Sequence, residues 1–94
     1  MAIARFVKTS INADEYDQMV SRLGIEGTPP PGGVFHLAAV GDDGIVKIVE
    51  IWDSREQAEA WGDKVAAARE AAGYGADRAP AIEYLEVHNI IERS

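Results

Sequence analysis

The alternation of hydrophobic and polar residues is clearest in the middle of the chain, where two apolar segments flank a turn. Residues 34–40 (VFHLAAV) and 45–52 (IVKIVEIW) are rich in β-branched and aromatic side chains. Asp43-Gly44 lies between them, and this dipeptide tolerates the positive φ angles of a tight hairpin turn. The pattern therefore predicts a β-hairpin.

The length of the turn decides which side chains of the hairpin share a face, because successive residues of a strand point to opposite sides. A two-residue turn, our starting assumption, places His36 on the same face as Ile51 and Val49. A three-residue turn places His36 with Glu50 and Trp52 instead. Both faces are largely apolar, so we expect both sides of the strand pair to be covered.

Two segments with helical periodicity each follow a capping signal. Asn12 with Glu15 predicts a helix over residues 13–23, and Ser54 with Gln57 predicts the start of a second helix. The apolar face of the first helix contains Tyr16, Met19, Val20 and Leu23, and that of the second contains Ala58, Trp61, Val65, Ala68 and Ala72.

Strand-like segments at the two ends complete the pattern. They are residues 2–8 and 81–91, and the connection 25–33 contains three consecutive prolines, which preclude a helix there. The order β-α-β-β-α-β predicts an α+β fold of the ferredoxin-like type, with a four-stranded antiparallel sheet and two helices on one face. We expect residues 1–94 to form a single domain. Because the other face of the sheet would be open and apolar, we expect a homodimer that packs sheet to sheet.

The composition narrows the range of partners. A net charge of −7 and the absence of a Lys/Arg cluster argue against nucleic acid or an anionic membrane as the main partner. The chain has no cysteine, which excludes disulfides, thiolate zinc sites and a cysteine nucleophile. Its start lacks the apolar core of a signal peptide, and no segment approaches the ~20 apolar residues of a membrane span. We expect a cytoplasmic protein.

Several short segments resemble the dimeric α/β barrel superfamily, the group that includes the antibiotic-biosynthesis monooxygenase-like proteins. They are Val34-Phe35-His36, the turn 42–44, the junction Glu50-Ile51-Trp52-Asp53-Ser54 with Glu56 and Trp61 after it, and Val87-His88-Asn89. The resemblance covers essentially the whole chain. It implies a dimer whose two sheets form a barrel, with a small-molecule pocket between the sheet and the helices of each subunit. It implies no single reaction, because the superfamily includes cofactor-independent oxygenases, heme-degrading enzymes, isomerases and polyketide cyclases.

Ionisable side chains on apolar strands are the candidates for chemistry, because each needs a partner or a function to offset its desolvation. His36 in the hairpin and His88 near the end of the last strand are candidate general bases toward a phenol or quinol proton, since imidazole exchanges protons near neutral pH. The alternative for His36 is a core or rim histidine bonded to the backbone. The alternative for His88 is a residue of the dimer interface or of the strand end.

Four further residues are candidates for substrate binding. Trp52 and Trp61 are candidate walls of a pocket for a flat aromatic ligand, or else part of a helix-on-sheet core. Tyr84 offers a hydroxyl to a ligand oxygen, as does the tyrosine of the first helix. Glu50 either has a raised pKa beside Trp52 or pairs with an arginine such as Arg5.

The sequence predicts no cofactor and no metal site, because the two histidines lack a nearby cluster of acids. The second helix contains no histidine, which departs from the heme-degrading branch of the superfamily. One hypothesis is a cofactor-independent monooxygenase of specialised metabolism that acts on an aromatic or polyketide-like substrate, or a related cyclase or isomerase without oxygen chemistry. The other is a ligand-binding or structural homodimer without enzymatic activity. A pocket of at least ~300 Å³ between sheet and helices would favour small-molecule binding.

Overall fold

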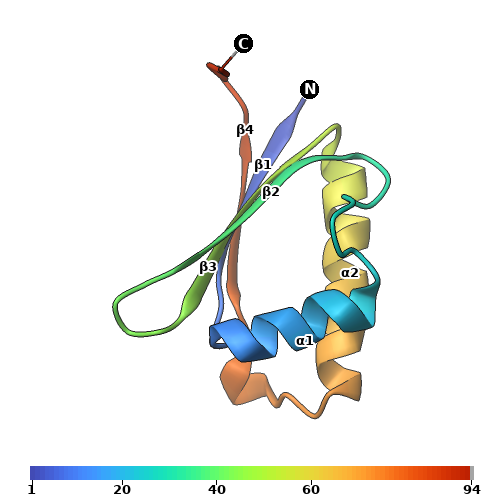
Figure 1. Cartoon of the computed structure of the whole chain (residues 1–94). Helices are drawn as coiled ribbons and strands as arrows, with labels where there is room; N and C mark the ends of the chain where they lie inside the picture. The colour runs from blue at the N-terminus through green and yellow to red at the C-terminus, as the bar shows by residue number, and fades with distance from the viewer. Residues whose placement is uncertain (94) are drawn as a thin grey trace.

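The structure is a computed structural model, and it describes residues 1–93. Its main elements are β1 (Ile3–Lys8), α1 (Ala13–Leu23), β2 (Gly33–Val40), β3 (Val46–Trp52), α2 (Arg55–Ala71) and β4 (Ala81–Glu86), with the short 3₁₀ helix η1 (Ala76–Arg78) before β4. The strands form one antiparallel sheet in the order β2-β3-β1-β4. Both helices lie on the same side of this sheet (Figure 1). The ferredoxin-like α+β fold predicted from the sequence is confirmed.

Both helices begin where their capping residues predict. Asn12 accepts a hydrogen bond from the backbone N–H of Glu15 at 2.9 Å, and the Glu15 carboxylate accepts one from the backbone N–H of Asn12 at 3.1 Å. This reciprocal pair satisfies donors at the helix start that have no partner within the helix. At α2 only one of these two reciprocal bonds forms. Ser54 Oγ accepts from the backbone N–H of Gln57, but the Gln57 side chain accepts from the Ser54 hydroxyl and not from the Ser54 backbone.

The hairpin turn has three residues, so the assumed two-residue turn is wrong. The Gly41 N–H donates to the Ile45 carbonyl at 3.0 Å, which makes these two the last paired residues and leaves 42–44 as the loop. Gly44 has φ +79°, a left-handed conformation that costs glycine little. The Asp43 carboxylate accepts from the Ile45 N–H at 2.9 Å and stabilises the loop. His36 is consequently paired with Glu50 and not with Ile51.

The last strand is shorter than the predicted segment 81–91. β4 ends at Glu86, which is paired with Ile3, the first residue of β1. One more backbone bond follows, from the Val87 N–H to the Ala2 carbonyl at 3.0 Å. Beyond that point β1 offers no further partner, and a strand without a partner is not stabilised.

The two faces of the sheet have different surroundings. On the helix-covered face, Trp52 packs with Ala58 and Trp61 of α2 in the core. The opposite face, which we call the open face, carries apolar side chains that remain between 39% and 47% exposed: Phe6, Phe35, Leu37 and Leu85. The sheet is therefore apolar on both sides, as predicted, but only one side is covered within the chain.

Replacing Asn12 by alanine tests the capping of α1. We expect Asn12→Ala to lower the free energy of unfolding by about 1 kcal/mol, because the backbone N–H of Glu15 loses its side-chain partner. The exposed Gln18→Ala in the same helix is the control and should change it by less than about 0.5 kcal/mol. Urea titration of the three proteins measures the difference, and equal midpoints would contradict the role of the cap.

Candidate functional site

The centre of the helix-covered face carries one row of polar side chains that crosses all four strands. In the strand register His36 is paired with Glu50, Glu50 with Arg5, and Arg5 with Tyr84. Residues of one such row point to the same side of a sheet. The three-residue turn is what brings His36 into this row, so the hairpin loop determines the composition of the site.

Glu50 accepts hydrogen bonds from three neighbours. Its Oε1 accepts from Arg5 Nη1 at 2.9 Å and from Trp52 Nε1 at 3.1 Å, and its Oε2 lies 3.0 Å from His36 Nδ1. The side chains of Arg5 and Glu50 are each only 3% exposed. Burial raises the pKa of Glu50, but the bond from His36, the charge of Arg5 and the bond from Trp52 together outweigh burial and hold the pKa below its usual value.

The predicted alternatives for Glu50 are thereby decided. It pairs with Arg5, and the raised pKa considered from the sequence is wrong, because the carboxylate is surrounded by donors and not only by an aromatic wall. The Nε of Arg5 has no hydrogen-bond partner among the described residues. Gly62 of α2 lies against this guanidinium: a Cβ built there would be 3.8 Å from Arg5 Nε.

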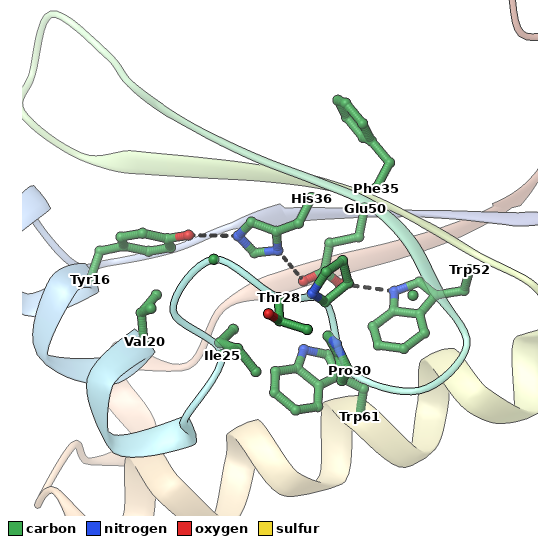
Figure 2. Close-up of a pocket in the computed structure, with 13 residues that line it drawn as sticks. Tyr16, Val20, Ile25, Thr28, Pro30, Phe35, His36, Glu50, Trp52 and Trp61 are labelled. Carbon is green, nitrogen blue, oxygen red and sulfur yellow. Dashed lines mark hydrogen bonds and ion pairs between the residues drawn. The ribbon is translucent and has the colours of Figure 1, made fainter.

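Tyr16 of α1 extends the row of polar side chains by one group. Its hydroxyl lies 2.6 Å from His36 Nε2, and Figure 2 shows the continuous chain from Tyr16 through His36 to Glu50. Burial raises the pKa of Tyr16, and the negative charge of Glu50 adds to the effect. Tyr16 therefore stays a protonated phenol at neutral pH. With Glu50 ionised, its carboxylate accepts from the Nδ1–H of His36, which leaves Nε2 free to accept the Tyr16 hydroxyl proton.

The sequence marked Tyr16 as a possible hydroxyl donor but did not associate it with His36. The two residues lie 20 positions apart on different elements, and no short motif joins them. The only available signal was the position of Tyr16 on the apolar face of the first helix. This face packs toward the sheet, but the pattern does not say which strand residue it meets.

Tyr16, His36 and Glu50 line a pocket of about 310 Å³, which we call the main pocket. Trp52 and Trp61 form an aromatic wall, with ring centroids 6.1 Å apart. The proline-rich loop between α1 and β2 covers another side, with Thr28 and Pro30 toward the cavity (Figure 2). The volume of the main pocket reaches the ~300 Å³ that a drug-sized substrate requires.

The remaining predicted residues lie elsewhere. Tyr84 does not line the main pocket; it packs beside the Trp52 and Trp61 cluster, with the Arg55 guanidinium 4.9 Å from its ring centroid. His88 follows the end of β4 and borders a shallow depression on the open face with Phe6 and other apolar residues. The structure therefore brings Glu50, Trp52, Trp61 and His36 together around the main pocket. Tyr84 belongs to the row of polar side chains but does not line the pocket, and His88 lies on the open face.

Two absences concern residues 1–93, the part of the chain that the structure describes. This part of the chain contains no group of three or more His, Cys, Asp or Glu side chains that could hold a metal ion. None of its helices is long and apolar enough to cross a membrane.

Solved structures with this arrangement of helices and strands define the class of fold. The chain is similar to candidate antibiotic biosynthesis monooxygenases from Caulobacter crescentus (23% identity, TM-score 0.68, 94% of this chain and 91% of that chain covered) and Deinococcus radiodurans (17%, 0.67, 100% and 99%). It is also similar to SnoaB, a cofactor-independent oxygenase from Streptomyces nogalater (11%, 0.61, 98% and 96%).

The chain thus has the ferredoxin-like fold of the antibiotic biosynthesis monooxygenase-like proteins, and the resemblance predicted from the sequence is confirmed for the fold. Comparisons with protein-family models and with curated protein sequences find no match.

Replacing Glu50 by glutamine tests the buried ion pair. Folding lowers the pKa of the Glu50 carboxyl, so its ionised form stabilises the protein at pH values above the pKa of the unfolded chain, which is ~4.3. This contribution is lost as the pH falls through the pKa of the folded protein. We expect Glu50→Gln to reduce the free energy of unfolding at pH 7 by roughly 3–5 kcal/mol, because the buried Arg5 charge loses its counterion.

The exposed Glu59→Gln is the matched control, since its ion pair with Arg55 lies at the surface and is worth at most about 1 kcal/mol. Denaturant titrations at neutral and acidic pH should also show that Glu50→Gln loses less stability on acidification than the unsubstituted chain does. An equal loss in both would contradict a lowered pKa of Glu50.

Proposed function

We propose that this protein is a cofactor-independent monooxygenase of specialised metabolism that removes a proton from a small aromatic or polyketide-like substrate. The observation that supports the proposal most directly is the hydrogen-bonded chain Tyr16–His36–Glu50 at the wall of the main pocket. The description of SnoaB, which has the same fold, as a cofactor-independent oxygenase supports a reaction of this class.

The hydrogen bonds define a route for the proton. Tyr16 Oη accepts the substrate proton while its own proton moves to His36 Nε2, a distance of 2.6 Å between heavy atoms. The resulting imidazolium donates both of its N–H groups, one to Tyr16 and one to Glu50. Glu50 stays ionised because its pKa is lowered, so it stabilises the positive charge that His36 acquires.

The aromatic wall suits the proposed substrate. Trp52 and Trp61 provide flat apolar surfaces for a ring, and a volume of about 310 Å³ accommodates only a small molecule. We call the hydrogen-bonded residues Tyr16, His36 and Glu50 the proton relay. Trp52 is held in place by its bond to Glu50, so the aromatic wall and the proton relay are both positioned by this carboxylate.

Oxygen chemistry follows from the deprotonated substrate. The carbanion of an activated CH₂ group transfers one electron to dioxygen, and the substrate radical and superoxide combine to form a C–O bond. The peroxide takes up the proton held by Tyr16 and His36. Loss of water, which contains the second hydrogen of the CH₂ group, leaves a carbonyl. The balance is CH₂ + O₂ → C=O + H₂O, so the electrons come from the substrate itself.

The same proton relay also supports a second candidate function. A polyketide cyclase or isomerase would use Tyr16 and His36 to remove and return a proton without consuming oxygen. The third possibility, a ligand-binding dimer without enzymatic activity, would use the main pocket and leave the relay as a structural network. Oxygen consumption separates the first candidate from the second, and turnover separates both from the third.

The proton relay predicts which substitutions abolish turnover. With an anthrone-type substrate, which carries an activated CH₂ group, we expect His36→Ala and Tyr16→Phe to slow oxygen consumption by roughly 10²–10⁴-fold, the usual loss when a positioned acid–base group is removed. His88→Ala is the matched control, because His88 borders the open face and not the main pocket. An oxygen electrode measures the rates, and unchanged rates in both relay variants would remove Tyr16 and His36 from the mechanism.

We further propose that the active form is a homodimer that packs through the open face of the sheet. Phe6, Phe35, Leu37 and Leu85 expose apolar surface there, and small chains rarely leave such a contiguous face in contact with water. A second copy of the chain presents the same apolar surface, which makes a symmetric interface complementary to itself.

Light scattering tests the dimer. We expect the mass of two chains at micromolar concentration, and we expect Leu37→Lys to shift it to the mass of one chain, because a buried interface would then contain an unpaired charge. Ala67→Lys on the exposed side of α2 is the control and should remain dimeric. A single-chain mass for the unsubstituted protein would contradict the proposal.

A further inference from the structure

A second cavity lies behind the proton relay. It has a volume of about 70 Å³ between the sheet and the two helices, and we call it the inner cavity. Tyr16, His36 and Glu50 line both the main pocket and the inner cavity, so the relay forms part of the wall between them. Any molecule in the inner cavity is therefore adjacent to the site where the proposed reaction produces its carbanion.

The size and lining of the inner cavity select a small apolar ligand. Apolar side chains from the sheet and both helices contribute to it, among them Val7, Ile48, Met19, Leu23 and Val65. About 70 Å³ is far below the ~300 Å³ of a pocket for a drug-sized molecule, yet larger than the ~30 Å³ that one water occupies in the liquid. A molecule of two or three heavy atoms fits this space.

The polar groups at the inner cavity leave little for a water molecule to bind. The hydroxyl of Thr9 donates to the Val46 carbonyl at 2.6 Å, and that of Ser10 donates to the Arg78 carbonyl at 2.7 Å. The Tyr16 hydroxyl is likewise bonded to His36. An ordered water in a protein usually needs two to four polar partners. The Nε of Arg5, which lacks a hydrogen-bond partner among the described residues, is the one buried side-chain donor left for a water, fewer than the two to four partners that it needs. The cavity therefore favours an apolar molecule over water.

The charges around the inner cavity favour reduction of that molecule. Arg5, Arg69 and Arg78 line it, and Glu50 is the one carboxylate among the lining residues in the described part of the chain. Arg5 is paired with Glu50, and Arg78 is paired at 3.0 Å with Glu15, which does not line the cavity, so the excess of positive charge comes from Arg69. Proton transfer to His36 adds another positive charge to the same wall. In a chain of net charge −7, this is a local excess of positive charge, and it stabilises an anion formed there.

We propose that the inner cavity binds dioxygen, the second substrate of the proposed monooxygenase reaction. This inference rests on the proposed function. The carbanion in the main pocket gives one electron to dioxygen in the inner cavity, which leaves a substrate radical on one side of the wall and superoxide on the other. Val20 and Ile25 also line both cavities and take no part in the hydrogen-bonded chain, so rotamer changes of these two side chains let superoxide reach the radical and form the C–O bond. The peroxide then takes up the proton and loses water, so the overall reaction remains CH₂ + O₂ → C=O + H₂O.

Dioxygen is paramagnetic, so its position can be measured directly without any turnover. Under elevated oxygen pressure we expect the methyl groups of Val7, Ile48 and Val65 to show stronger NMR relaxation enhancement than the buried methyl group of Ala58, which does not line the inner cavity. Equal enhancement at all four residues would overturn the proposal. So would methyl shifts with added chloride and none with oxygen, because they would identify an anion site.

A variant that narrows the inner cavity tests the link to catalysis. Val65 lines the inner cavity but not the main pocket, and Val65→Leu adds one methylene group there. We expect KM for oxygen to rise roughly tenfold with KM for the organic substrate unchanged. Ala67→Leu on the exposed side of α2 is the control and should leave both KM values unchanged.

The outcomes separate this inference from the proposed function. An unchanged KM for oxygen in a folded Val65→Leu protein overturns the inner cavity as the oxygen site, although oxygen is still consumed and the proposed function stands. Relaxation enhancement at the cavity methyls together with turnover that continues without oxygen overturns the monooxygenase function, and with it the catalytic use of the cavity.

Discussion

The site depends on one buried carboxylate, that of Glu50. It lies at the centre of the sheet, accepts hydrogen bonds from Arg5, Trp52 and His36, and is almost completely shielded from water. Transfer of such a charge out of water costs several kcal/mol unless donors surround it. Because three donors from three strands converge on its two oxygens, their side chains are held in fixed positions. The same contacts hold the imidazole, one wall of the main pocket and the centre of the sheet together.

A buried ion pair is weak evidence for stability as such, since a well-packed apolar pair of similar size is often as stable. Its role here is better understood as positioning. Glu50 orients His36 through Nδ1, and His36 in turn directs Nε2 toward Tyr16. The fold therefore fixes the tautomer of His36 through contacts within the chain, and the proton transfer that we propose follows these contacts.

The two cavities share one wall and differ in the rest of their lining. The main pocket has an aromatic side and lies under a loop of glycines and prolines, which suits an organic ring. The inner cavity is smaller, apolar and bordered by guanidinium groups. The relay residues Tyr16, His36 and Glu50 face both, so a charge produced in one is felt in the other across only a few ångströms of low-dielectric protein. Glycine at position 62 contributes to this compact arrangement, because a Cβ there would lie only 3.2 Å from the Tyr84 hydroxyl.

The sequence by itself determined the elements and their order, because capping residues, periodicity and turn dipeptides act over a few neighbouring positions. It predicted α1 over residues 13–23 and gave pairing with Arg5 as one of two alternatives for Glu50. The tertiary structure alone decided the register of the hairpin, since a turn of two or three residues exchanges every side chain between faces. It also decided the contact of Tyr16 with His36 and the end of the last strand, because each depends on a partner from a distant segment. The local pattern fixed which residues form strands and helices, and the packing of those strands and helices fixed which residues form the site.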